Sequence, residues 1–237
     1  MTPRITCIIP TFNECSRISD VLTVVTQYVN FSEIIVVDDG STDQTAEILS
    51  QYKNVTTVTH EKNKGKAAAL ATGLEKSTSE IAVFLDADLI GLREENLNDL
   101  LAPVLKENCM SISLLQNAVT ISHLLGIDPW SGQRALWKKD IDTLGKKFQK
   151  AGYAIELIFN DIAIKKGLPI YSIPWPNVRF ISKAEKDEQK NGTVADIQMF
   201  ITAGSIFGFH KAFWQIFLFF PVFALKKKIL PSSIFRN

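Results

Sequence analysis

The chain has 237 residues, 46% of them hydrophobic, which is enough for one substantial core but too few to predict two independent domains. Its 26 basic and 25 acidic residues leave a formal net charge of +1, so no overall positive field indicates a nucleic-acid partner. The three cysteines (Cys7, Cys15 and Cys109) are odd in number and lack metal-ligand spacing, which argues against a disulfide framework or a structural zinc site and favours a reducing compartment.

The first 106 residues alternate short apolar runs with helical patterns. The apolar runs predict buried strands at residues 5–10, 34–37, 55–59 and 81–85. Between and after them, apolar residues at helical spacing and turn or cap residues predict helices at residues 18–28, 46–52, 65–74 and 94–106. This alternation predicts a mainly parallel sheet with right-handed crossovers.

The pattern is less regular after about residue 111. We expect helices at residues 139–150 and 154–166, and an edge strand bounded by prolines at residues 169–174.

Acidic and turn-forming residues stand at the carboxyl ends of the predicted strands. Asn13 and Glu14 follow the first strand, Asp39 follows the second, and Asp86 and Asp88 follow the fourth. In α/β folds this edge of the sheet is where ligands bind, so it is the predicted active site. Two other acids in these motifs are expected to be structural: Asp38 as scaffold and Asp43 as a helix cap.

The spacing of Asp86 and Asp88 favours a cation site. On an extended segment residues i and i+2 point the same way, so both carboxylates can approach one hard cation. The alternative is that these acids only cap the following turn.

Four motifs in order carry a family resemblance: Pro10-Thr11-Phe12-Asn13-Glu14, Val37-Asp38-Asp39-Gly40-Ser41-Thr42-Asp43, Asn63-Lys64-Gly65-Lys66 and Asp86-Ala87-Asp88. Together they resemble family 2 glycosyltransferases of the GT-A fold. The resemblance implies an α/β fold in which helices flank a mainly parallel, twisted sheet with a Rossmann-like nucleotide-binding half. It also implies an inverting hexosyltransferase that uses a UDP- or GDP-sugar.

The same resemblance assigns the donor site residue by residue. It implies Mg²⁺ or Mn²⁺ at Asp86 and Asp88, with Asp88 as a catalytic residue. It implies that Asn13, Glu14 and Asp39 surround the base and ribose and that Lys66 lies near the donor. The full nucleotide-sugar site that it implies comprises Pro10, Thr11, Asn13, Glu14, Asp39, Gly40, Lys66 and Asp86.

A second block comprises Ser131-Gly132-Gln133-Arg134-Ala135 and, later, Gly152-Tyr153-Ala154-Ile155-Glu156. It is similar to the polyprenyl-phosphate branch of the family, which includes dolichyl-phosphate mannose synthases. The planar guanidinium of Arg134 could bind an acceptor phosphate or the leaving diphosphate, unless it forms a structural salt bridge. Ser131, Arg134 and Arg179 are therefore the predicted acceptor residues, and Arg134 is also a predicted catalytic residue.

The role predicted for Glu156 depends on the acceptor. A sugar hydroxyl needs a general base, and Glu156 is the candidate. A lipid phosphate is already anionic, and Glu156 would then orient loops or bond Arg134.

Two departures from the polyprenyl-phosphate branch keep other functions open. Ile90 stands where that branch often has a further polar residue on the metal side, and residues 111–116 lack its usual arginine. Arg179 could supply the missing charge. The alternatives are transfer to a saccharide or small-molecule hydroxyl, or a non-catalytic member that binds a nucleotide sugar.

An aromatic run at residues 206–225 is followed by Lys226-Lys227-Lys228. We expect a catalytic domain at residues 1–200 and a tail at residues 201–237, in which the aromatic run forms a helix at the membrane interface. A buried or spanning helix is the alternative. With no signal-peptide pattern after Met1, the protein is expected to be cytoplasmic and peripheral on the inner face of the membrane.

Overall fold

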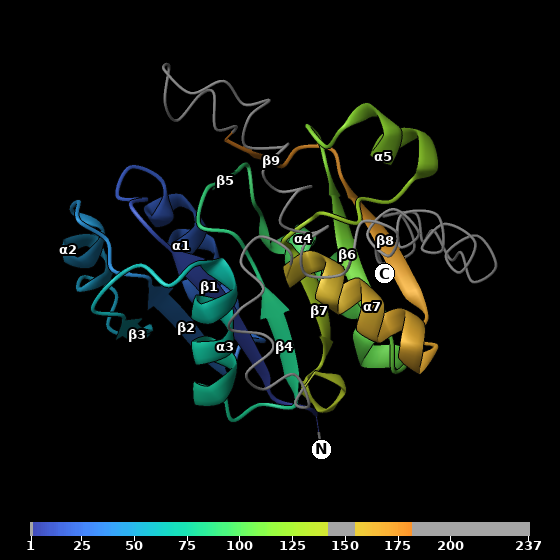
Figure 1. Cartoon of the computed structure of the whole chain (residues 1–237), viewed down its shortest axis with the longest axis horizontal. Coiled ribbons are helices and arrows are strands. Elements are labelled where there is room, and N and C mark those ends of the chain that lie inside the picture. The colour runs from blue at the N-terminus through green and yellow to red at the C-terminus, as the bar shows by residue number, and fades with distance from the viewer. Residues whose placement is uncertain (1, 142–154, 182–237) are drawn as a thin grey trace.

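The computed structural model describes residues 2–141 and 155–181, whose centre is a seven-stranded sheet of order β3-β2-β1-β4-β7-β6-β8 (Figure 1). A second sheet pairs the short strands β5 and β9. The strand bounds are β1 (Ile5–Thr11), β2 (Glu33–Asp38), β3 (Thr56–Thr59), β4 (Ile81–Phe84), β5 (Leu89–Ile90), β6 (Met110–Leu115), β7 (Arg134–Trp137), β8 (Ile170–Trp175) and β9 (Arg179–Phe180).

Helices cover both faces of the large sheet. Successive strand residues point to opposite faces, so in β1 Cys7 and Ile9 belong to one hydrophobic cluster and Ile8 to the other. The first cluster includes residues of α1 and α4, and the second includes residues of α3 and α7, which lie in front of the sheet in Figure 1. The helix bounds are α1 (Ile18–Gln27), α2 (Thr45–Leu49), α3 (Lys66–Lys76), α4 (Glu94–Lys106), α5 (Thr120–Leu125) and α7 (Ile155–Lys166), with a 3₁₀ turn at Lys138–Asp140.

The sheet is mainly parallel, as predicted, with β7 as the exception. β1 lies between β2 and β4 in parallel pairing, and β6 pairs in parallel with β8. β7 runs antiparallel to both β4 and β6, and its register places Arg134 opposite Phe84. The loop that precedes β7 therefore lies beside the loop that follows β4, at the edge where Asp86 is found.

The strands and helices predicted in the first 106 residues are confirmed, with small shifts at their ends; α2, for example, ends at Leu49 instead of residue 52. The predicted edge strand is confirmed as β8, and the helix predicted at residues 154–166 is confirmed from Ile155 onward. The helix predicted at residues 139–150 begins in the 3₁₀ turn, and most of it lies outside the described residues.

Within residues 2–141 and 155–181, no helix has the length and apolar character needed to cross a membrane. The aromatic tail at residues 201–237 lies outside these ranges, so its membrane-interface helix stays a prediction.

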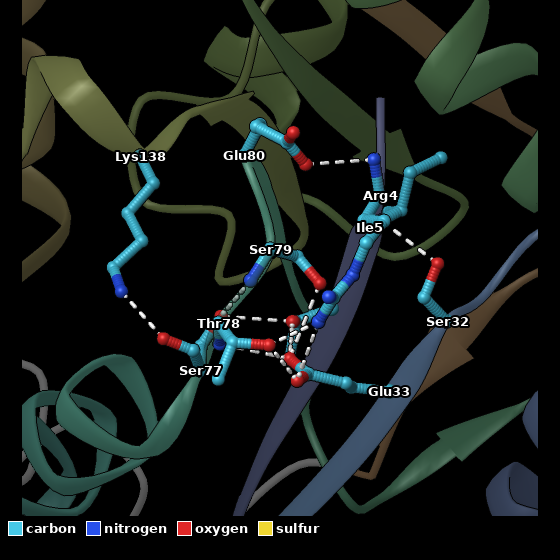
Figure 2. Close-up of polar contacts among 10 residues, drawn as sticks. Arg4, Ile5, Ser32, Glu33, Ser77, Thr78, Ser79, Glu80 and Lys138 are labelled. Carbon is cyan, nitrogen blue, oxygen red and sulfur yellow. Dashed lines mark hydrogen bonds and ion pairs between the residues drawn. The ribbon is translucent and has the colours of Figure 1, made fainter. Parts of the chain in front are cut away.

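A polar cluster around Glu33 joins the amino ends of β1, β2 and β4 (Figure 2). The Glu33 carboxylate accepts hydrogen bonds from the Thr6 hydroxyl, the Thr78 hydroxyl and N–H, and the Ser79 hydroxyl, and it pairs with Arg4 at 3.1 Å. Burial acts to raise the pKa of Glu33, but the hydrogen bonds outweigh it and lower the pKa to about 2. This cluster stabilises the sheet at the end opposite the predicted active site.

Candidate active site

The loops after β1 and β2 are bonded to each other at the carboxyl edge of the sheet. The Asn13 N–H donates to Ser41 Oγ at 2.9 Å, and the Thr42 N–H donates to Asn13 Oδ1 at 2.8 Å. Asn13 has a φ of +56°, a left-handed conformation that asparagine tolerates better than most residues. Two motifs 28 residues apart in sequence thus form one surface.

Glu14 and Asp43 extend this contact toward α2. The Glu14 N–H donates to Thr45 Oγ1 at 3.0 Å, and the largely buried Glu14 carboxylate pairs with Arg17 at 2.7 Å. Asp43 accepts hydrogen bonds from the N–H groups of Thr45, at the start of α2, and of Cys15. Asp43 thus bonds the first residue of α2, although the N-cap position itself is taken by Gln44.

Asp39 is buried and holds the loop that precedes α3. Its carboxylate lies 2.6 Å from Nδ1 of His60 and accepts the N–H groups of Lys64 and Gly65, the latter at 2.7 Å. The other ring nitrogen of His60 lies 2.9 Å from Thr72 Oγ1 on α3. Asp39 therefore fixes the start of α3, and the part taken by His60 was not foreseen from the sequence. Contact of Asp39 with a nucleotide stays a prediction.

Gly40 allows the loops after β2 and β3 to touch. Its φ is +77°, and a Cβ atom at this position would lie 2.8 Å from the carbonyl carbon of Lys62. Only glycine meets both conditions without a shift of the backbone. Next to it, Asp38 accepts the Ser41 N–H at 2.9 Å, in agreement with its predicted scaffold role.

Lys66, Asp86 and Glu156 meet across three elements. Lys66 Nζ lies 2.7 Å from Asp86 Oδ1 and 2.8 Å from Glu156 Oε1. Lys66 is the first residue of α3, Asp86 follows β4, and Glu156 lies in the first turn of α7. Burial acts to lower the pKa of Lys66, but the two carboxylates outweigh it and raise the pKa above its ordinary value. The site thus contains a lysine that stays protonated.

The loop before β7 packs directly onto this ion pair. A Cβ atom on Gly132 would lie 2.4 Å from Asp86 Oδ2 and 2.7 Å from Lys66 Nζ, so a side chain here would displace the ends of these two side chains. The neighbouring Gln133 donates from Nε2 to Asp86 Oδ2 at 2.7 Å. No role was predicted for Gln133, and the only indication in the sequence was its place inside the Ser131–Ala135 motif.

Ser131 is buried, and its hydroxyl is bonded within the protein. Its Oγ donates to Gln133 Oε1 at 2.9 Å and lies 2.9 Å from Ser113 Oγ. Its side chain is covered because the loop folds back onto β6. The bonds of Ser131 support Gln133, and its contact with an acceptor substrate stays a prediction.

The phosphate-binding role predicted for Arg134 stays a prediction, and its side chain is 0% exposed. The guanidinium donates to the carbonyl oxygens of Ser131 and Glu156, at 2.5 and 3.3 Å, and to Asn160 Oδ1 at 3.1 Å. It also lies 5.1 Å from the centre of the Phe159 ring. Burial lowers the pKa of Arg134 to about 10, which leaves it protonated at neutral pH. Arg134 ties the loop before β7 to α7.

Arg179 lies near the acidic loop. β9 pairs antiparallel with β5, and this register puts Arg179 opposite Ile90, two residues after Asp88. Both Asp88 and Arg179 are half-buried. The predicted use of Arg179 as a replacement for a missing positive charge stays a prediction, with a geometry that permits it.

The donor set at Asp86 and Asp88 fits a cation that arrives with a phosphate ligand. In the described part of the chain, no group of three or more His, Cys, Asp or Glu side chains is arranged to hold a metal. Mg²⁺ is commonly held by one or two carboxylates plus substrate phosphates and water, and two half-buried carboxylates at a strand end match that pattern.

Residues 6–117 match the family model described as glycosyl transferase family 2. The relatives include the glycosyltransferase AglE of Haloferax volcanii, 38% identical over 36% of this chain and 31% of its own length. They also include a dolichyl-phosphate beta-glucosyltransferase of Trichomonas vaginalis, 36% identical over 35% of this chain and 28% of its own length. The chain thus matches about a third of the length of these relatives.

The fold is shared with solved structures. Glucosyl-3-phosphoglycerate synthase from Mycobacterium tuberculosis, in complex with Mn²⁺, UDP-glucose and phosphoglyceric acid, aligns with a TM-score of 0.67 and 22% identity. The alignment covers 86% of this chain and 79% of that chain. The GT-A fold expected from the motifs is confirmed, including the part after residue 117 that lies beyond the family match.

Proposed function

We propose that the protein, whose residues 6–117 form a family 2 glycosyltransferase domain, transfers a sugar from a UDP- or GDP-sugar to polyprenyl phosphate with inversion. The observation that carries the proposal is the convergence of Lys66, Asp86 and Glu156 on one point of the sheet edge. The loops that contain the nucleotide motifs lie along the same edge.

The donor would lie over the loops after β1, β2 and β3. Asn13, Glu14 and Asp39 would surround the base and ribose, with Pro10, Thr11 and Gly40 shaping the floor. Lys66 would approach the diphosphate, where a protonated ammonium favours the anion. The bonds between the first two loops support this assignment because they preform one binding surface.

Asp86 and Asp88 would hold Mg²⁺ or Mn²⁺ together with the donor phosphates. The cation would offset the negative charge that develops on the leaving diphosphate. A cation of this kind accompanies UDP-glucose in the mycobacterial synthase.

The state of Glu156 favours an acceptor that is already anionic. Its carboxylate is buried and paired with Lys66 at 2.8 Å, so the pair would have to break before Glu156 could act as a general base. A lipid phosphate needs no such base, and a dolichyl-phosphate glucosyltransferase is among the relatives. The runner-up is a hydroxyl acceptor, favoured by the phosphoglyceric acid in the mycobacterial synthase.

A lipid acceptor would require contact with the membrane. We therefore propose that the protein acts in the cytoplasm as a peripheral protein on the inner face of the membrane, held there by residues 201–237. The aromatic run and its three terminal lysines support this placement.

The test compares wild type with Asp88→Ala in sugar transfer from UDP- and GDP-sugars to a membrane lipid extract, with Mn²⁺ present. We expect Asp88→Ala to lose on the order of 100-fold or more in rate, since a Lewis acid contributes several kcal/mol. Asp161→Asn is the matched control, because Asp161 pairs with Lys165 on the outer part of α7. Equal turnover by wild type and Asp88→Ala would refute the metal role, and donor binding in calorimetry without turnover would indicate a non-catalytic member.

A further inference from the structure

We propose that Gln133 is a positioning residue that fixes the orientation of the Asp86 carboxylate for cation binding. The proposal rests on the proposed function, because it takes Asp86 to be part of the metal and diphosphate site. Gln133 is 1% exposed, directly precedes β7, and donates from Nε2 to Asp86 Oδ2 at 2.7 Å. Because the Gln133 side chain is buried, it contacts Asp86 and is not exposed to a substrate.

The two oxygens of Asp86 have separate partners. Oδ2 accepts the Gln133 amide, whereas Oδ1 lies 2.7 Å from Lys66 Nζ. With a contact at each oxygen, the Gln133 bond restrains the torsion of the carboxylate about its Cβ–Cγ bond. The bond thus keeps one oxygen of Asp86 directed at the positively charged part of the site.

Two buried serines set the orientation of the Gln133 amide. The Ser131 hydroxyl donates to Gln133 Oε1 at 2.9 Å, and Ser113 Oγ on β6 lies 2.9 Å from Ser131 Oγ. Since Oε1 accepts from Ser131, the NH₂ group of Gln133 is the part that faces Asp86. The chain of bonds runs from the core of the sheet to Asp86, and all three supporting side chains are buried.

Supporting bonds of this kind tune a metal site without adding a ligand. Outer partners orient ligating carboxylates, and their loss typically lowers metal affinity by about 10–100-fold. The role needs a donor facing Asp86 and an acceptor facing Ser131, and a glutamine amide supplies both. A methionine has similar length and neither group, which makes Gln133→Met the informative substitution.

The experiment measures Mn²⁺ binding to the full chain by the loss of the free-Mn²⁺ electron paramagnetic resonance signal, with UDP or with GDP present. We expect Gln133→Met to bind Mn²⁺ about tenfold more weakly than wild type, and Ser131→Ala to show a smaller loss. Gln51→Met is the matched control, because Gln51 is exposed beyond the end of α2. Thermal unfolding of each variant is measured alongside.

The outcomes separate the two proposals. Wild-type affinity in Gln133→Met would overturn the positioning role and leave the metal site standing. Absence of Mn²⁺ binding to wild type with either nucleotide would overturn the metal site and the positioning role together. Weaker Mn²⁺ binding in Gln133→Met, with an unfolding temperature close to that of wild type, would support the positioning role, because general loss of packing would lower both quantities.

Discussion

The ammonium of Lys66 lies 2.7 Å from Oδ1 of Asp86, so an acid predicted to hold a metal is already paired with a cation of the chain itself. The same nitrogen lies 2.8 Å from Glu156. Lys66 therefore balances two carboxylates, and the side chains of Lys66 and Asp86 are 22% and 25% exposed. A divalent ion that binds Asp86 would compete with this lysine.

Lys66→Met should change metal binding and donor binding in opposite directions. Without the ammonium, Asp86 and Glu156 remain close together and attract an external cation, so Mn²⁺ alone should bind more tightly than to wild type. A UDP- or GDP-sugar should bind at least about tenfold more weakly, because a phosphate contact is lost. Titration of Mn²⁺ without nucleotide, and calorimetry of the nucleotide sugar, measure the two effects.

Lys165→Met is the control for this pair of measurements, since Lys165 is an exposed lysine that pairs with Asp161 on α7. If Lys66→Met weakens both Mn²⁺ and donor binding, the variant has disturbed the site as a whole, and the competition between lysine and metal is refuted.

Glu156→Gln should retain transfer to polyprenyl phosphate within about tenfold of wild type, because an anionic acceptor needs no general base. The neutral amide can still accept a hydrogen bond from Lys66, which also keeps its pair with Asp86. The measurement is the initial rate of lipid glycosylation at saturating donor. A loss of about 100-fold or more, the size typical of a missing general base, would instead favour the hydroxyl-acceptor alternative.

Arg134→Lys should lower stability rather than impair phosphate binding. A lysine keeps the charge but cannot reproduce the fork that reaches Ser131, Glu156 and Asn160, so buried acceptors lose their donors. We expect the free energy of unfolding to fall by about 1–3 kcal/mol, measured by urea denaturation. Arg93→Lys, at an exposed position before α4, is the control. Unchanged stability together with a raised KM for the acceptor would support the phosphate role of Arg134 instead.

Glu33→Gln should remove a pH-dependent part of the stability. The pKa of Glu33 is lowered from 4.5 to about 2 in the folded protein, so its carboxylate stabilises the fold above pH 4.5. That contribution is lost as the pH falls from 4.5 toward 2. At neutral pH the free energy of unfolding of the variant should fall by about 1 kcal/mol, which is less than is typical for hydrogen bonds to a charged group because Glu33 is partly solvated.

Urea denaturation of wild type and Glu33→Gln at successive pH values measures this difference, with Glu61→Gln at an exposed position as the control. The gap between wild type and Glu33→Gln should close as the solution becomes acidic. A gap that stays constant down to pH 2 would show that the Glu33 charge is not what stabilises this end of the sheet.

The sequence was a good guide where the strands are buried on both faces. β1, β2 and β4 are continuous apolar runs, and their carboxyl ends carry the motif residues, so both the sheet and its functional edge could be predicted. The loops after β1 and β2 could also be predicted to lie together, because neighbouring parallel strands end at the same edge of the sheet.

The part of the site around Gln133, Arg134 and Glu156 was harder to predict, because it depends on the antiparallel strand β7 and on a buried charge. β7 is four residues long and begins with Arg134, a residue type that is rarely buried, so a surface role was the natural interpretation. The bond between Gln133 and Asp86 joins residues 47 apart in sequence, and only the register of β7 against β4 reveals it.

The most direct test of the account is transfer itself. Full-length protein, Mn²⁺ and vesicles that contain polyprenyl phosphate are incubated with UDP- and GDP-sugars in turn, and the lipids are analysed by mass spectrometry. The account predicts that polyprenyl phosphate gains one sugar residue from one of these donors, and that chelation of Mn²⁺ or the substitution Asp88→Ala abolishes the product. Glycosylation that continues in the Asp88→Ala variant, or a wild-type protein that consumes no nucleotide sugar with any lipid or saccharide acceptor, would contradict it.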